Sequence, residues 1–287
     1  MNKYEAVKNM QIYIENNLDK KITLADLAKV CYYSPWYSYR LFQEILNMSP
    51  AEYIRKLRLS KSALELRDKK RKIIDVAYKY GYDSVDGYQR AFFREFKVNP
   101  YEYSIAPKPL CLFTPYKKYD DKEKKTMSEV SNVFVSIVEK PQRKVIIKRG
   151  IKADNYIDYC MEVGCDVWGI LSSIKSLDNE PVCLWLPKKY VKENTSVYVQ
   201  GAEVSLDYTD IPEGFDTIIL PKATYLKFNG EPFEEENYGQ AIENLWKAIE
   251  KFKPENMGYQ WDDQNPRIQL EPIGSRGYIE LLSVKKI

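Results

Sequence analysis

Residues 31–53 read CYYSPWYSYRLFQEILNMSPAEY, and residues 81–103 read GYDSVDGYQRAFFREFKVNPYEY. A unit that occurs twice at a fixed spacing indicates a repeated structural element, and this repeat organises the first third of the chain. The residues that are identical at an offset of 50 include Arg40 and Arg90, Phe42 and Phe92, Pro50 and Pro100, Glu52 and Glu102, and Tyr53 and Tyr103.

The first copy predicts two short helices joined by a tight turn. Thr23 is placed to cap the first helix, with Asp26 three residues later as an acidic relative of the capping box. Ser34 caps the second helix, and Pro35 fills its first position, where a missing N–H costs little. This is the helix-turn-helix plan, whose second helix enters the major groove of DNA. On the second helix, a stripe at positions i, i+3 and i+4 consists of Trp36, Tyr39 and Arg40.

The second copy follows the same plan. An apolar stretch over residues 73–77 predicts the supporting helix, Gly81 supplies the turn, and Ser84 caps the next helix. We expect the core side of that helix to be formed by Phe92, Phe93 and Phe96, and a polar stripe on another side by Asp86, Gln89 and Arg90.

Residues 49–67, between the copies, read as one longer helix. About 17 residues give a spacer of about 26 Å, which with the width of the supporting helices sets the two second helices about one DNA turn apart. One chain then grips two successive major-groove segments, with Arg40 and Arg90 placed to bond guanine or phosphate. A helical bundle whose repeat serves stability only is the open alternative.

Charge is distributed unevenly along the chain. Residues 1–110 hold 20 Lys and Arg against 13 Asp and Glu, whereas residues 133–287 hold 19 against 24. A basic first third favours an anionic partner for the N-terminal part. The alternative is a basic surface that is merely solvated.

The chain has 287 residues and no histidine. This composition excludes a Ser-His-Asp triad, a Cys-His dyad and any zinc site that needs imidazole, and we expect no catalytic residue, metal or cofactor. No charged-then-apolar signal segment and no apolar run near 18 residues is present, which predicts a cytoplasmic protein with no membrane partner. Five cysteines with no CxxC pair indicate buried, reduced thiols: Cys31, Cys111, Cys160, Cys165 and Cys183.

The remaining sequence divides into a linker and a second domain. Prolines followed by a dense run of mixed charge mark the linker over residues 106–132. We therefore expect an all-α domain with two helix-turn-helix units over residues 1–105 and a second domain over residues 133–287.

The second domain contains a repeat of its own. KPQRKVIIKRG (residues 140–150) aligns with LPKATYLKFNG (residues 220–230), and PVCLWLP (residues 181–187) aligns with PRIQLEP (residues 266–272). Each copy reads as strand-helix-strand-strand. The domain is therefore predicted to be α+β, with helices on one face of a sheet.

Residues 1–105 resemble the DNA-binding domain of the AraC family of transcriptional regulators. The resemblance is carried by LADLAKVCYYS, YRLFQEI, SPAEYIRKLRL, IIDVAYKYGYDS and YQRAFFREFKVNPYEY. It implies that bases are read by Trp36, Tyr39 and Arg40 in the first copy and by Val85, Asp86, Gln89 and Arg90 in the second.

Two residues depart from the family pattern. Tyr32 stands where the family usually has glycine, so a positive φ at this turn would strain the bulky residue. Asp86 places a negative charge on a reading helix, where it either accepts a hydrogen bond from a cytosine amino group or acts against wrong sites.

Residues 133–287 resemble the GyrI-like small-molecule-binding domain, which also occurs in multidrug-sensing regulators. The segments that carry the resemblance are NYIDYCMEVGCDVWGIL, EPFEEENYGQAIENLW and RGYIELLSV. The resemblance implies a ligand groove on a pseudo-twofold axis, lined by aromatic side chains, with an acidic residue on the last strand that here is Glu280.

Strand alternation puts Glu280 on the same face as Tyr278 and opposite Ile279. If the Ile279 face packs on helices, Glu280 faces the open side, where a carboxylate among aromatic rings favours a cationic or aromatic ligand. Four other candidate wall residues each have an alternative role in the core: Trp168, Trp185, Tyr225 and Trp261.

Taken together, these features predict a one-component transcriptional regulator. The two resemblances together imply an activator, while the residues themselves leave activation and repression open. Its expected partners are double-stranded DNA and a small-molecule effector. Two alternatives are open: the second domain hydrolyses strained electrophilic compounds, as reported for some GyrI-like domains, or the protein regulates without a ligand by contacting RNA polymerase.

Overall fold

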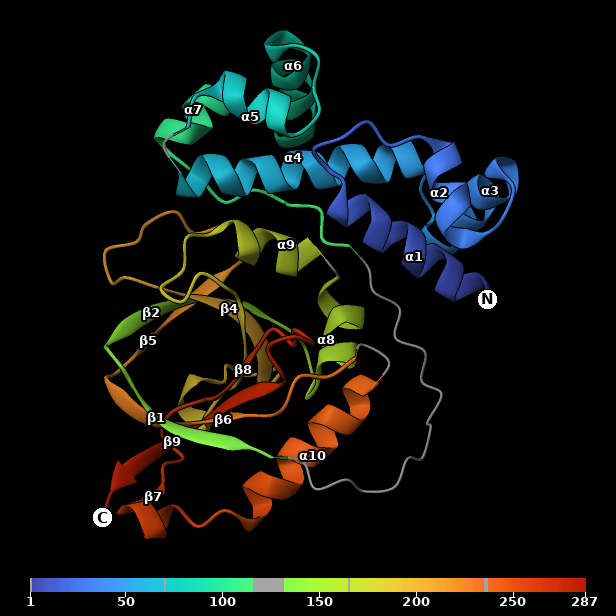
Figure 1. Cartoon of the computed structure of the whole chain (residues 1–287). Coiled ribbons are helices and arrows are strands. Elements are labelled where there is room, and N and C mark those ends of the chain that lie inside the picture. The colour runs from blue at the N-terminus through green and yellow to red at the C-terminus, as the bar shows by residue number, and fades with distance from the viewer. Residues whose placement is uncertain (1, 70, 116–131, 165, 235–236) are drawn as a thin grey trace. The chain divides into compact units, whose positions relative to one another are not determined.

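The chain forms two compact units, residues 1–118 and residues 119–287 (Figure 1). The computed structural model describes residues 2–69, 71–115, 132–164, 166–234 and 237–287. Cys165 and most of the predicted linker lie outside these ranges. The expectation of buried cysteines holds for Cys31 and Cys183 but is wrong for Cys111, which is exposed, and Cys160 is half-buried. None of the described helices is both long and apolar enough to cross a membrane.

The described part of the first unit is helical. Its helices are α1 (Lys3–Asn16), α2 (Leu24–Cys31), α3 (Pro35–Leu46), α4 (Pro50–Asp68), α5 (Ile73–Lys79), α6 (Val85–Phe96) and α7 (Pro100–Ile105). The predicted caps are confirmed. The side chains of Thr23, Ser34 and Ser84 accept hydrogen bonds from backbone N–H groups in the first turns of α2, α3 and α6.

Helix α4 joins two hydrophobic cores. Tyr53 and Leu57, in its first half, pack with α1, α2 and α3, whereas Leu59, Ala63 and Leu66 pack with α5, α6 and α7. Each helix-turn-helix therefore has a core of its own, and the two share one continuous helix. Because α4 has 19 residues, its length is about 28 Å, close to the predicted spacer.

The first part of the predicted linker packs on the first unit. Leu110 and Leu112 are buried in the core with α5 to α7, and the Phe113 N–H donates to Ser60 Oγ at 2.8 Å. The domain boundary at residue 105 stays a prediction, but a fragment that keeps this packing has to extend beyond Phe113.

The turn inside each helix-turn-helix copy uses left-handed backbone. Gly81 has φ +72° and Tyr32 has φ 56°. The conformation that favours glycine is therefore present at Tyr32, whose side chain projects into solvent. A Cβ at Gly81 would lie 2.7 Å from Arg58 Nη2, so this glycine also makes room for the arginine.

The expectation that Phe93 belongs to the core is wrong. Its side chain is 55% exposed, whereas Phe92 is fully buried and Phe96 packs partly into the core. In a helix with 3.6 residues per turn, Phe93 lies about 100° around the axis from Phe92, on the side of Arg90.

The second unit is built on an antiparallel sheet with the strand order β1-β6-β9-β8-β3-β4-β2-β5, and β7 pairs with β9. The strands are β1 (Phe134–Lys140), β2 (Arg143–Arg149), β3 (Val182–Trp185), β4 (Tyr198–Val204), β5 (Asp216–Leu220), β6 (Ala223–Asn229), β7 (Tyr259–Trp261), β8 (Arg267–Leu270) and β9 (Ile279–Lys286). The described α-helices that accompany them are α8 (Tyr156–Val163), α9 (Asp166–Ser173) and α10 (Tyr238–Lys251).

The two faces of this sheet are covered differently. On one face Ile146 and Ala202 pack with α8 and α9, while Leu226 and Phe228 pack with α10. On the other face, alternate residues of the strands pack on one another, and Ile279 belongs to this core. The sheet is therefore curled around an interior that the strands themselves fill, with the helices outside (Figure 1).

The expectation that Glu280 faces an open side is wrong. Glu280 pairs with Phe228 on β6 and with Gln269 on β8, and directly paired residues share a face of the sheet. Since Phe228 lies under α10, Glu280 lies on the helix-covered face, and it is the Ile279 face that meets the interior.

Candidate functional site

The first candidate surface lies on α3. Ser34 Oγ accepts from the Tyr37 N–H at 3.3 Å, which fixes the start of the helix. The predicted stripe is exposed: Trp36 is 66% exposed, and Tyr39 and Arg40 are also classed as exposed. The Arg40 guanidinium carbon lies 4.7 Å from the centroid of the Trp36 ring, a cation–π contact that holds the two side chains together.

The equivalent surface lies on α6, where Ser84 Oγ accepts from the Gly87 N–H at 3.1 Å. Asp86 and Arg90 are exposed, and Val85 and Gln89 are half-buried. Asp86 stands in the first turn, where a carboxylate is favoured by the positive end of the helix dipole. Its acidic side chain therefore has a structural role besides any role toward DNA.

Neither Arg40 nor Arg90 forms an ion pair with another described residue, so both guanidinium groups are available for an anionic or base partner. The exposed stripe on each helix also continues for one more turn beyond the residues that the sequence predicted. Gln43 on α3 and Phe93 on α6 are both exposed at seven residues beyond the first member of their stripe. Counting the helical period forward from Trp36 and Asp86 would have found them.

Arg58, on α4, ties the two helix-turn-helix copies together. Its Nε and Nη2 atoms donate to the Leu18 and Lys20 carbonyls at 3.0 and 2.5 Å. Its Nη1 atom donates to the Gly81 carbonyl, in the turn of the second copy, at 3.5 Å. Burial lowers the pKa of this guanidinium from its ordinary value, although nearby carboxylates and Tyr82 oppose the shift.

The second unit gathers three side chains around one carboxylate. Glu280 is fully buried, and its Oε1 atom accepts from the Tyr278 hydroxyl at 2.7 Å and from Trp246 Nε1 at 3.1 Å. Arg267 donates to Oε2 from Nε at 2.7 Å and to Oε1 from Nη2 at 2.8 Å. Burial, and then the charge of Glu280, raises the pKa of Tyr278 above its ordinary value.

Arg267 also lies between two tryptophan rings. Its guanidinium carbon is 3.7 Å from the Trp185 centroid and 4.1 Å from the Trp246 centroid. We call Trp185, Trp246, Tyr278 and Glu280 the aromatic cage. A planar cation already occupies the cage, and it is the protein's own arginine.

The other predicted wall residues lie elsewhere. Tyr225 is on the opposite face of the sheet, and its hydroxyl accepts from Arg143 Nη2 at 3.4 Å. Trp168 packs beside the core under α8 and α9, and the Trp261 ring lies 6.4 Å from the ring of Phe228. Sequence reasoning missed Trp246 and Arg267, which reach the cage from α10 and β8. Their distance from Glu280 along the chain left no local signal.

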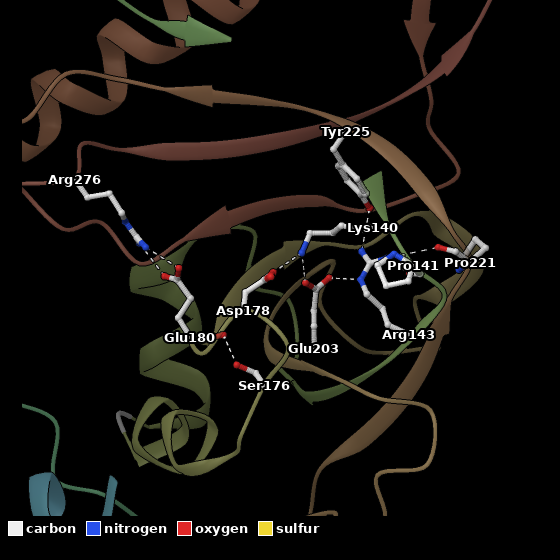
Figure 2. A network of polar contacts seen from close by, with 10 residues as sticks. All are labelled: Lys140, Pro141, Arg143, Ser176, Asp178, Glu180, Glu203, Pro221, Tyr225 and Arg276. Atoms are coloured by element: carbon white, nitrogen blue, oxygen red, sulfur yellow. Dashed lines mark hydrogen bonds and ion pairs between the residues drawn. The ribbon is translucent and has the colours of Figure 1, made fainter. Parts of the chain in front are cut away.

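A second group of charges surrounds a cavity of about 370 Å³ on the interior side of the sheet (Figure 2). Lys140 bonds Asp178 at 2.6 Å and also pairs with Glu203, which in turn accepts from Arg143 Nε at 2.5 Å. At the other end of the cavity, Arg276 binds Glu180 through two hydrogen bonds of 2.6 and 2.8 Å.

These charges connect the two halves of the sheet. Lys140 lies on β1 beside β6, and Glu203 lies on β4 beside β2. Lys140, Arg143 and Arg276 are each paired with a carboxylate. We therefore interpret the network as structural, because its charges hold the two halves of the sheet together. No group of three or more His, Cys, Asp or Glu side chains in the described ranges is arranged to hold a metal ion.

Comparison with known proteins identifies the first unit. A helix-turn-helix domain model matches residues 27–104. The Transposon Tn10 TetD protein of Escherichia coli is 41% identical over 98 residues, which cover 34% of this chain and 71% of that protein. The regulatory protein SoxS of Salmonella typhimurium is 34% identical over 103 residues, which cover 36% of this chain and 96% of SoxS.

Longer proteins match over a smaller share of their length. The Right origin-binding protein of Escherichia coli strain K12 is 35% identical over 107 residues, and the match covers only 37% of either chain. Among solved structures, a transcriptional regulator with an AraC-type DNA-binding domain from Chromobacterium violaceum has 21% identity and a TM-score of 0.34. That match covers 36% of this chain and 95% of the other.

Proposed function

The chain belongs to the AraC family of helix-turn-helix DNA-binding transcriptional regulators, and from this premise we propose that it is a sequence-specific activator controlled by a small-molecule effector. The DNA-reading part of the proposal rests on the matched stripes of α3 and α6. Each stripe follows a serine cap, begins with an exposed residue, and carries an exposed arginine with no ion pair among the described residues.

We assign base reading to Trp36, Tyr39 and Arg40 on α3 and to Val85, Asp86, Gln89 and Arg90 on α6. An exposed arginine on a capped helix is suited to the N7 and O6 acceptors of guanine. The α4 spacer of about 28 Å supports simultaneous binding of two successive major-groove segments.

The proposal is tested by selecting duplexes from a random pool with the full-length chain. Sequence-specific binding predicts enrichment of one motif with two conserved blocks about one helical turn apart. Enrichment of no motif, with binding that depends only on salt concentration, would contradict it. Chains carrying both Arg40→Ala and Arg90→Ala provide the control and should enrich no motif.

Activation rather than repression is supported by one relative. The HTH-type transcriptional activator AarP of Providencia stuartii is 31% identical over 100 residues. An activator acts through the transcription machinery, so we extend the proposal to a contact with RNA polymerase. Transcription in vitro from a promoter that carries the selected motif measures the sign of control directly.

For the second unit we propose a GyrI-like effector-binding domain made of two strand-helix-strand-strand copies. The strand order supports this. Read from the two edges of the sheet toward its middle, the halves are β1-β6-β9-β8 and β5-β2-β4-β3, and they meet where β8 pairs with β3. Strands β6, β9 and β8 of one half thus hold the same places as β2, β4 and β3 of the other. The helices α8 and α9 accompany one half and α10 accompanies the other.

We place the effector at the aromatic cage, where Glu280, Tyr278 and Trp185 meet. The resident Arg267 constrains the ligand, because it already neutralises the buried carboxylate. A cationic aromatic effector has to displace Arg267 from between the two tryptophan rings, and the side chain is 28% exposed and so has solvent to move into.

Tryptophan fluorescence tests this placement. Benzyltrimethylammonium should quench the tryptophan fluorescence of the full-length chain, and Glu280→Gln should require a higher concentration of this probe. The concentration of neutral benzyl alcohol needed for quenching should change much less. Equal losses for both probes would remove Glu280 from the site. Four donor atoms already engage the carboxylate of Glu280, which does not favour its use as the base of a hydrolase.

A further inference from the structure

Helix α6 presents a phenylalanine to solvent on the face that we assign to DNA. Phe93 is 55% exposed, although the adjacent Phe92 is fully buried. Single exposed apolar side chains are common on protein surfaces, so the exposure of Phe93 alone assigns it no role, and its place on the helix decides the argument.

The spacing places Phe93 in the reading stripe. Asp86, Gln89, Arg90 and Phe93 stand at positions i, i+3, i+4 and i+7 of α6, so they follow one line along the helix surface. A recognition helix that lies along the major groove contacts bases from positions with this same spacing. Phe93 would therefore meet the groove one turn beyond Arg90.

The first copy has a polar residue at the equivalent place. Gln43 stands seven residues after Trp36 on α3 and is also exposed. The two helices thus share an arginine at the third position of the stripe and differ at the other three, and at the fourth one offers an amide and the other an aromatic ring. This difference makes the two helices read unlike half-sites.

Among the four bases, thymine presents a methyl group in the major groove, and an apolar side chain is the group that recognises it. We propose that Phe93 reads the C5-methyl group of a thymine in the half-site bound by α6. The inference rests on the proposed role of α6 as a reading helix. It adds a base preference that no polar residue of the stripe supplies.

The proposal is tested with the duplex that the full-length chain selects from a random pool. Each thymine of the α6 half-site is replaced in turn by 2′-deoxyuridine, which keeps base pairing and removes only the methyl group. At one thymine the unaltered chain should lose about fourfold in affinity, the effect expected for one apolar methyl contact.

Two variants complete the test. Phe93→Ala, whose folding is checked by thermal unfolding, should bind the thymine and uracil duplexes equally. Gln43→Ala should keep the fourfold preference for the methyl group, because it alters the other helix. A double-mutant cycle of protein and base then gives the coupling between the ring and the methyl group.

The proposal is overturned if Phe93→Ala discriminates thymine from uracil as well as the unaltered chain does. It is also overturned if the unaltered chain is indifferent to every methyl group, or if the selected half-site has no thymine. These results leave sequence-specific binding itself intact. Failure of the chain to select any motif instead contradicts the proposed function.

Discussion

Arg40 is the sixth residue of α3 and Arg90 is the sixth residue of α6, and each follows a serine N-cap by six positions. Because the caps fix where each helix begins, the two arginines leave their helices in the same direction relative to the turn before them. Equivalent placement on two helices is what a protein with two reading surfaces requires.

Replacing Arg40 or Arg90 with alanine should cost about 1–3 kcal/mol for the selected site and should relax the preference at one base pair each. Competition binding against single-base variants of the site measures both effects. If either variant loses affinity equally on all sequences, that arginine contacts phosphate and does not read a base.

Asp86→Ala should raise non-specific DNA binding and reduce discrimination between sites, because it removes a negative charge from the surface that we propose for DNA. The same change should lower helix stability by about 0.3–1 kcal/mol, since Asp86 stands at the favourable end of the α6 dipole.

Asp86→Asn separates the two effects, because it keeps a hydrogen-bonding side chain and removes the charge. Affinity for a random duplex, measured at two salt concentrations, is the readout for all three chains. An unchanged affinity for random DNA, together with weaker binding to the selected site, would show that Asp86 makes a favourable direct contact.

A fragment of residues 1–115 should bind DNA with a steep salt dependence, and residues 133–287 should fold separately without binding DNA. The fragment has to include Leu110 and Leu112, because both are buried in the core around α5 to α7. A shorter fragment that ends at residue 105 is the matched control and should unfold at a lower temperature. DNA binding by residues 133–287 would overturn this division of roles.

The Arg267–Glu280 pair should show strong coupling in stability. Arg267→Met leaves the fully buried carboxylate without its cation and should cost about 3–5 kcal/mol, whereas Glu280→Gln keeps hydrogen-bonding atoms and should cost less. The double variant Arg267→Met with Glu280→Gln removes both charges and should recover most of the loss. Urea unfolding followed by tryptophan fluorescence measures all three, and strictly additive effects would contradict the coupling.

Local features of the first unit could be predicted from the sequence because they depend on neighbours in the chain. The caps at Thr23, Ser34 and Ser84 satisfy N–H groups only two or three residues away, so residue type and spacing are enough. Phe93 differs from the expectation because a helix cannot turn the adjacent residues Phe92 and Phe93 to the same side, so apolar character alone does not place both in the core.

The facing of Glu280 could not be predicted, since strand alternation gives two faces without saying which one the helices cover. In the curled sheet both faces of β9 are buried, so neither burial nor composition separates them. The cage also depends on contacts between β8, β9 and α10, which only the strand register and helix packing bring together. Such non-local contacts leave no pattern in a single sequence.

The most direct test of two reading surfaces is protection of guanine N7 atoms from methylation by dimethyl sulfate on the selected duplex. The full-length chain should protect guanines in two clusters about one helical turn apart, with Arg40→Ala losing one cluster and Arg90→Ala losing the other. A single protected cluster, or loss of the same cluster in both variants, would contradict the account of one chain that reads two successive major-groove segments.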